Sequence, residues 1–193
     1  MHTRIDERVE HITSRLNVGN IYVNRDQIGA VVGSQPFGGE GMSGTGPKAG
    51  GPYYVSRFKK APLPEHKLVR EDYIDPAKVQ VALDKAKTDK HTPLETIDMP
   101  GPTGETNRWS TFARGTILCL GPTKADAGKQ AKIAQQMGCA AVCVAPGLDA
   151  SVGLSGFLAR TALSNLSGFD GVALWSSVED LRTARQALAE RKG

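Results

Sequence analysis

The amino-acid sequence predicts an α/β protein whose C-terminal part is built around a parallel sheet. Two observations favour this fold class. From residue 116 onward, short apolar runs alternate with segments of helical periodicity, the pattern of consecutive strand–helix units. Aromatic residues make up only 6% of the chain, which suits an α/β core of Ala, Val and Leu. Residues 1–60 lack this alternation and are predicted to form a separate part.

The first part begins with an amphipathic helix, predicted over residues 3–16. Apolar residues recur there at helical spacing, with charged residues between them (Ile5, Val9, Ile12 and Leu16). Three short strands are expected after it, at residues 21–23, 30–32 and 53–58.

A glycine-rich segment, residues 35–52, separates the last two of these strands. It holds seven of the 22 glycines and three of the 11 prolines, so neither a helix nor a regular strand is expected there. Residues 39–44 satisfy G-x-G-x-x-G, but Pro47 and Pro52 forbid the helix that a dinucleotide-binding loop needs. We therefore reject a nucleotide-binding role for this loop.

The same segment has the properties of an anion-binding loop. Backbone N–H groups without covering side chains can converge on a carboxylate, and Ser43 adds a hydroxyl donor. Lys48 either adds positive charge or is solvated. The alternative is a special turn that binds no ligand, and the residues alone leave both interpretations open.

Residues 61–114 are predicted to be a linker with one short helix. Asp75 is the expected N-cap and Pro76 the first helical residue, with the helix ending near residue 87. Residues 88–107 are rich in Pro, Gly and Thr and are expected to form a loop.

Residues 115–193 are predicted to form a Rossmann-like domain with three strand–helix units. Thr123 and Ser177 are expected helix N-caps, and Asp180 is placed to reach back to the second cap. Strands are expected at residues 117–120, 140–145 and 172–175, and helices at residues 123–137, 154–163 and 177–191.

Composition and charge exclude several function classes. The net charge is +4 and no run of Lys or Arg exceeds two residues, so nucleic-acid binding is not expected. No segment has the roughly 20 apolar residues of a membrane span. The charged N-terminus lacks the apolar part of a signal peptide, so we expect a cytoplasmic protein.

The three cysteines are expected to be buried core thiols and not nucleophiles or metal ligands. Cys119 lies in an apolar run, and Cys139 and Cys143 would face the same side of one strand. The four histidines are scattered, so no metal site is predicted.

Four stretches resemble proline utilization A, a bifunctional family of proline-oxidising enzymes. Residues 20–25 (NIYVNR) and 35–52 (QPFGGEGMSGTGPKAGGP) resemble the end of its aldehyde dehydrogenase catalytic domain. Residues 101–120 (GPTGETNRWSTFARGTILCL) and 169–175 (FDGVALW) resemble a downstream region of its longer members.

The resemblance implies a C-terminal fragment in three parts. Residues 1–60 would end the catalytic domain, residues 61–114 would be a linker, and residues 115–193 would be a truncated, aldehyde-dehydrogenase-like domain of Rossmann shape. The glycine-rich segment would anchor the α-carboxylate of the substrate. By position, the anchoring residues are Met42, Ser43 and Gly44, with Phe37 near the substrate pocket.

The implied activity is oxidation of L-glutamate-γ-semialdehyde (1-pyrroline-5-carboxylate) to L-glutamate with NAD. The nucleophilic cysteine, the glutamate that activates water and the NAD fold would lie upstream, and FAD would belong to a separate proline dehydrogenase domain. We therefore expect no catalytic, cofactor-binding or metal-binding residues here. The partners would be the rest of the enzyme and the substrate, with homo-oligomers possible in principle. The alternative is a non-catalytic interaction or oligomerisation module.

Overall fold

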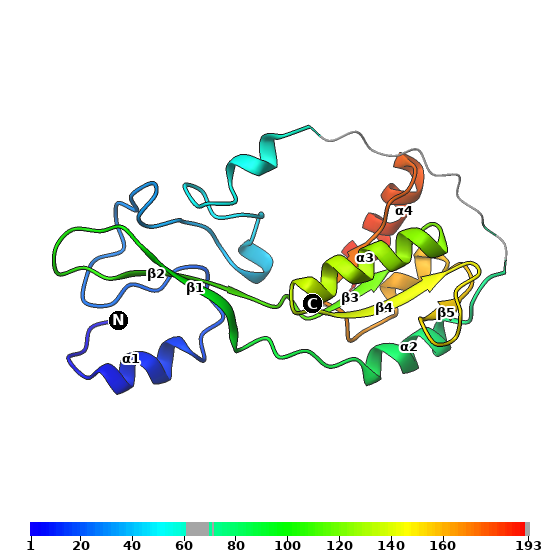
Figure 1. Cartoon of the computed structure of the whole chain (residues 1–193), viewed down its shortest axis with the longest axis horizontal. Helices are drawn as coiled ribbons and strands as arrows, with labels where there is room; N and C mark the ends of the chain where they lie inside the picture. The colour runs from blue at the N-terminus through cyan, green and yellow to red at the C-terminus, as the bar shows by residue number, and fades with distance from the viewer. Residues whose placement is uncertain (61–69, 71, 192–193) are drawn as a thin grey trace. The chain divides into compact units, whose positions relative to one another are not determined.

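The computed structural model describes residues 1–60, 70 and 72–191, and the chain forms two compact units (Figure 1). The first unit comprises Met1–Ala61 and Glu95–Thr111, and the second comprises Pro62–Leu94 and Phe112–Gly193. Residues 61–69, at the start of the predicted linker, lie outside the described residues. The compact units do not follow the predicted boundaries, because residues 95–111 group with the N-terminal part.

A four-stranded parallel sheet forms the centre of the second unit, in the order β5–β4–β3–β6. Its strands are β3 (Thr116–Cys119), β4 (Ala140–Ala145), β5 (Leu154–Ser155) and β6 (Gly171–Ala173). Counted from β3, this order is 3-2-1-4, that of the first four strands of the Rossmann arrangement. The predicted α/β fold class with a parallel sheet is confirmed.

Helices cover both faces of this sheet. On one face, α3 (Lys124–Gln136) packs Ala127 and Ala131 against the two cysteines of β3 and β4. On the other face, the residues next to each cysteine (Leu118, Leu120, Val142 and Val144) pack against α2 (Pro76–Lys85), α4 (Val178–Ala189) and the 3-10 helix Arg160–Ser164. The period-two alternation along the strands therefore supplies two apolar layers.

The predicted helix caps of the second unit are confirmed. Asp75 accepts a hydrogen bond from the Ala77 N–H at 2.9 Å, and Pro76 opens α2. Thr123 caps α3 and Ser177 caps α4, each accepting from a backbone N–H of the first turn. The carboxylate of Asp180 does not reach back to its cap. It is buried and accepts from Arg160 Nε at 3.0 Å.

The helix predicted over residues 154–163 is wrong. Leu154 pairs with Val144 as a short strand, and Phe157 forms a parallel bridge with Tyr73. Gly156, with a φ of 132°, lies between these two pairings, where a helix cannot continue. The 3-10 helix begins only at Arg160.

The first unit has little regular structure. The helix α1 (Asp6–Thr13) is shorter than predicted, and none of its residues is buried. The strands predicted at 21–23 and 30–32 are absent from the described residues 1–60, and the strand predicted at 53–58 is the 3-10 helix Val55–Phe58. Positive φ angles at Asn24, Gly29 and Gly33 turn the chain where those strands were expected.

A β-hairpin replaces the loop predicted over residues 88–107. It consists of β1 (Pro93–Met99) and β2 (Asn107–Phe112), which form a two-stranded sheet. The connection is too short for a parallel crossover. The hydroxyl groups of Thr96 and Ser110 are 2.9 Å apart across the two strands.

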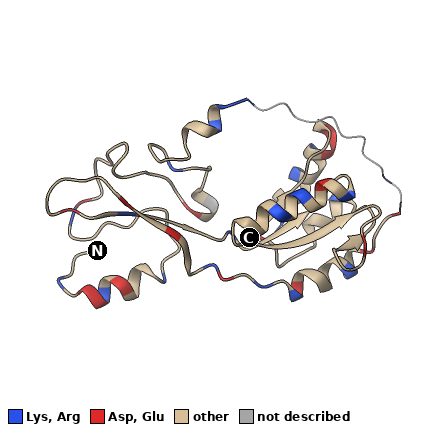
Figure 2. Cartoon of the chain, in the orientation of Figure 1, with Lys and Arg blue, Asp and Glu red and all other residues tan. Residues whose placement is uncertain are grey.

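Charged residues of both signs lie along α1, α3 and α4 (Figure 2).

In the part of the chain that the structure describes, no helix has the length and apolar character needed to cross a bilayer.

Candidate functional site

The glycine-rich segment is a loop with a closed base. Phe37 and Ala49 exchange two backbone hydrogen bonds of 3.0 and 2.9 Å in an antiparallel bridge. One step outward, the Gly33 N–H donates to the Gly50 carbonyl at 3.1 Å. The two ends of the segment are therefore held together, and the residues between them form one loop.

Two side chains clamp this base. Asn20 donates from Nδ2 to the Pro36 carbonyl at 2.9 Å and accepts from the Gly38 N–H at 3.1 Å. The ammonium group of Lys48 donates to the carbonyls of Gly19 and Gly38. Partial burial lowers the pKa of Lys48, while the nearby Glu40 opposes that shift. Lys48 thus clamps the base of the loop through its ammonium group.

The tip of the loop is a single 3-10 turn, Gly41–Ser43. The Ser43 N–H and hydroxyl both donate to the Glu40 carbonyl, at 3.2 and 2.9 Å. The Gly44 N–H donates to the Gly41 carbonyl at 3.0 Å. The structure therefore brings the backbone of Met42, Ser43 and Gly44 together in one turn, whereas Phe37 lies at the base of the loop and is half exposed.

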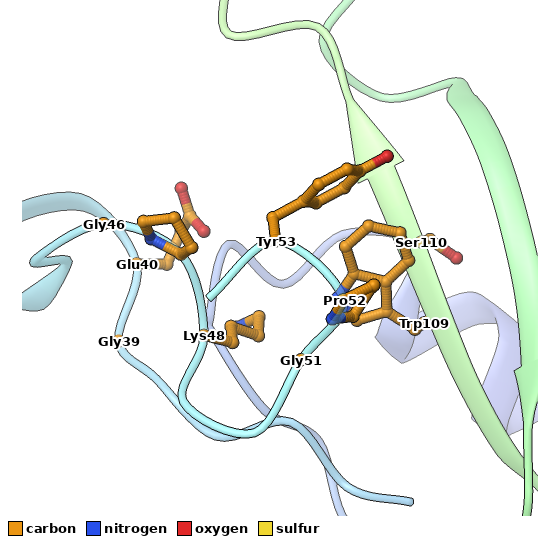
Figure 3. A pocket seen from close by; sticks show the side chains of 10 residues that line it. Gly39, Glu40, Gly46, Lys48, Gly51, Pro52, Tyr53, Trp109 and Ser110 are labelled. Atoms are coloured by element: carbon orange, nitrogen blue, oxygen red, sulfur yellow. The ribbon is translucent and has the colours of Figure 1, made fainter. Parts of the chain in front are cut away.

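A small cavity of about 160 Å³ lies between this loop and β2 (Figure 3). Glu40 and Lys48 line it from the loop, and Trp109 and Ser110 line it from the hairpin. The ring of Trp109 packs against that of Tyr53, with centroids 5.3 Å apart. Sequence reasoning missed Trp109, because it lies more than fifty residues beyond the loop in a segment assigned to the linker.

Arg57 is a second residue near the loop that the sequence did not indicate. Its guanidinium lies so close to Gly46 that a Cβ at that position would overlap it. The flexible Arg57 side chain could move aside, but Gly46 has a φ of 128°, which side chains disfavour, so the backbone conformation favours glycine here.

The turn after β3 is where a sheet of this order would bind a dinucleotide pyrophosphate. Here the Gly121 N–H donates to Gln130 Oε1 at 3.0 Å, and Gln130 Nε2 donates to the Gly121 carbonyl at 2.9 Å. The carboxylate of Asp126 lies in the first turn of α3 and accepts from the Thr123 hydroxyl at 2.7 Å. The N–H is occupied and a negative charge faces the helix N-terminus, so this turn does not fit NAD.

Replacing Gln130 with leucine is expected to destabilise the second unit by about 2 kcal/mol, because it removes the partner of the buried Gly121 N–H and leaves the Gly121 carbonyl with the Trp175 N–H as its donor. Urea unfolding followed by circular dichroism measures this change. Gln136→Leu, at an exposed position near the end of α3, is the matched control. Equal stability of the two variants would contradict the assigned role of Gln130.

The three cysteines are buried free thiols, as predicted. Cys119 and Cys143 face each other in the register of β3 and β4. The hydrogen bond with Cys143 and burial both raise the pKa of Cys119, which disfavours its thiolate. Among the described residues, His, Cys, Asp and Glu side chains form no group of three that could hold a metal ion.

Comparison with known proteins agrees with the resemblance noted in the sequence. The aldehyde dehydrogenase family matches residues 1–61. The bifunctional protein PutA of Rhizobium meliloti is 37% identical over 100% of this chain, and that of Escherichia coli is 34% identical over 100%. The whole chain resembles PutA. It spans only 17% of the length of those relatives, as a fragment of such a protein would.

A second group of relatives matches a shorter stretch. The 1-pyrroline-5-carboxylate dehydrogenase of Bacillus thuringiensis is 49% identical over 28% of this chain and 11% of its own length. The PutA relatives, in contrast, match both compact units.

Proposed function

We propose that this chain is the C-terminal part of a PutA-type enzyme that oxidises L-glutamate-γ-semialdehyde to L-glutamate. Within it, the glycine-rich loop binds the α-carboxylate of the substrate. The observation that carries this proposal is the loop itself: a clamped base that presents Met42, Ser43 and Gly44 in one turn. Names of the relatives, which include a 1-pyrroline-5-carboxylate dehydrogenase, support the substrate assignment.

The bonds within the turn indicate how a carboxylate would bind. The N–H groups of Ser43 and Gly44 and the Ser43 hydroxyl donate to carbonyls of the same loop. A carboxylate carries full negative charge and is a stronger acceptor than a neutral carbonyl, so it would replace them. Phe37, at the loop base, would pack against the aliphatic part of the substrate.

The other chemical groups would come from the remainder of the enzyme. NAD would accept the hydride, and its binding fold, the thiol nucleophile and the glutamate that activates water would belong to parts of the relatives that this chain does not span. FAD would belong to a separate proline dehydrogenase domain. The chain alone would then be inactive, and the whole enzyme would act in the cytoplasm.

The remainder of the enzyme would also cover the first unit. Only Gln35 and Pro36 are buried among the residues of that unit whose burial the structure describes. Ile28 and Val32 are 82% and 83% exposed, and Phe58 is also exposed. Apolar surface of this extent is typical of an interaction face.

The same exposed apolar face favours the alternative function, an interaction or oligomerisation module. Size-exclusion chromatography of the isolated chain distinguishes the two. A concentration-independent dimer of defined size would favour the module. A monomer, or aggregation relieved by the missing part of the enzyme, would favour the fragment.

A chimera tests the proposed function directly. The segment of Rhizobium meliloti PutA that aligns with this chain is replaced by the chain itself, and NADH formation from L-glutamate-γ-semialdehyde is measured. We expect activity in the chimera and none in a variant that lacks the segment. An inactive chimera that folds with bound NAD would contradict the proposal.

A further inference from the structure

Gln35, the residue at the entrance of the glycine-rich loop, is a buried polar residue, with 8% of its surface exposed. Its backbone N–H donates to the Val31 carbonyl at 2.7 Å, and its side-chain oxygen accepts from the Val31 N–H at 3.3 Å. Its amide nitrogen donates to Glu105 Oε1 at 2.6 Å. The entrance of the loop is thus attached to a residue seventy positions away in the sequence.

Glu105 lies in the turn of the β1–β2 hairpin and joins three side chains. Asn107 donates to Glu105 Oε1 at 2.9 Å, and Arg25 forms an ion pair with Oε2 at 3.2 Å. The hydrogen bond from Asn107 is the main reason that the pKa of Glu105 is lowered, with further contributions from Gln35 and Arg25. The carboxylate is therefore charged at neutral pH and holds its donors through charge-assisted bonds.

The hairpin also contacts the exit of the loop. Tyr53 follows the last residue of the glycine-rich segment, and its ring packs on that of Trp109 in β2. The cavity between loop and hairpin is lined from both sides, with Glu40 opposite Trp109 (Figure 3). One hairpin therefore holds both ends of the loop, with Glu105 at the entrance and Trp109 at the exit.

We propose that the β1–β2 hairpin is a brace that positions the glycine-rich loop, and that Glu105 and Trp109 are its positioning residues. Neither would touch the substrate. Both act by fixing the two ends of the loop, so that the turn at Ser43 keeps one orientation. The consequence for substrate binding rests on the proposed function, but the ordering of the loop does not.

Hydrogen–deuterium exchange on the 193-residue chain, without substrate, tests the brace. In Glu105→Ala, the amides of residues 36–52 are expected to exchange about tenfold faster, because the hydrogen bond that ties the Gln35 side chain to the Glu105 carboxylate is lost. Glu105→Gln keeps an acceptor for Gln35 but loses the charge, so it should show a smaller increase. Asp98→Asn, an exposed carboxyl on the same hairpin, is the matched control and should leave the loop unchanged.

Trp109 provides an independent arm of the same experiment. Trp109→Ala is expected to accelerate exchange at the exit of the loop, around Tyr53, and Trp109→Phe should restore most of the protection. In the chimera, Glu105→Ala should raise the KM for the semialdehyde and leave turnover of a carboxylate-free aldehyde unchanged. If Glu105→Ala left the KM unchanged but still accelerated exchange in the loop, the proposed binding of the carboxylate would be contradicted and the brace would not.

Three results would overturn the brace. The first is an unchanged exchange rate of the loop amides in the Glu105→Ala variant. The second is an increase that spreads evenly over the whole first unit, α1 included, because that indicates general unfolding. The third is a wild-type loop that already exchanges as fast as an unstructured peptide.

Discussion

Replacing Gly39 with alanine in the chimera is expected to lower kcat/KM for L-glutamate-γ-semialdehyde by about 100-fold, the effect of displacing a binding group by about 1 Å. A Cβ at Gly39 would lie 2.5 Å from Ser43 Oγ and closer still to the Ser43 carbonyl oxygen. The backbone of the turn must move to accommodate it. The change therefore displaces the proposed anchor without removing any of its donors.

Gly128→Ala is the control for this substitution. Gly128 lies within α3, and a Cβ there would meet no atom within 4 Å. This variant should keep the kcat/KM of the unmodified chimera. A Gly39→Ala chimera with wild-type kcat/KM would show that the position of Ser43 is irrelevant to the reaction.

Ser43→Ala is expected to weaken binding of the semialdehyde by about 1 kcal/mol or more, through the loss of one hydrogen bond to a charged group. The KM should rise about fivefold or more. An aldehyde of similar length without the α-carboxylate should keep its KM, because it makes no bond to the loop. Steady-state kinetics of the chimera with both aldehydes measures this difference.

Ser56→Ala is the matched control for the hydroxyl. Ser56 donates to the Tyr53 carbonyl at 2.7 Å, the same local bond that Ser43 makes to Glu40. It should leave both KM values unchanged. If Ser43→Ala raised the KM of both aldehydes equally, the hydroxyl would have a structural role, and an unchanged KM would remove Ser43 from the site.

Local signals explain why the second unit could be predicted from the sequence. Asp75, Thr123 and Ser177 cap helices through bonds to residues two or three positions away. The strand β4 begins and ends where the apolar run predicts. Residues 154–163 were mispredicted because the pairing of Phe157 with Tyr73 comes from a distant part of the chain.

The first unit was harder to predict because its structure depends on long-range partners. The Pro, Gly and Thr content of residues 88–107 predicts a loop, and the hairpin that forms there has no buried residue in either strand to give an apolar strand pattern. The resemblance implies Met42, Ser43 and Gly44 as anchoring residues, and this role stays a prediction. The residues that hold the loop in place could not be predicted from the sequence, because Asn20, Glu105 and Trp109 contact it from up to seventy positions away.

The most direct test of the whole account is an assay of NADH formation by the isolated 193-residue chain with NAD and L-glutamate-γ-semialdehyde, with the chimera as the positive control. We expect turnover by the chimera and none by the chain, because under the proposed function the chain would supply the carboxylate-binding loop and the rest of the enzyme would supply the nucleophile. Turnover by the isolated chain would contradict this account, and Cys119, Cys139 and Cys143 would be the first residues to replace.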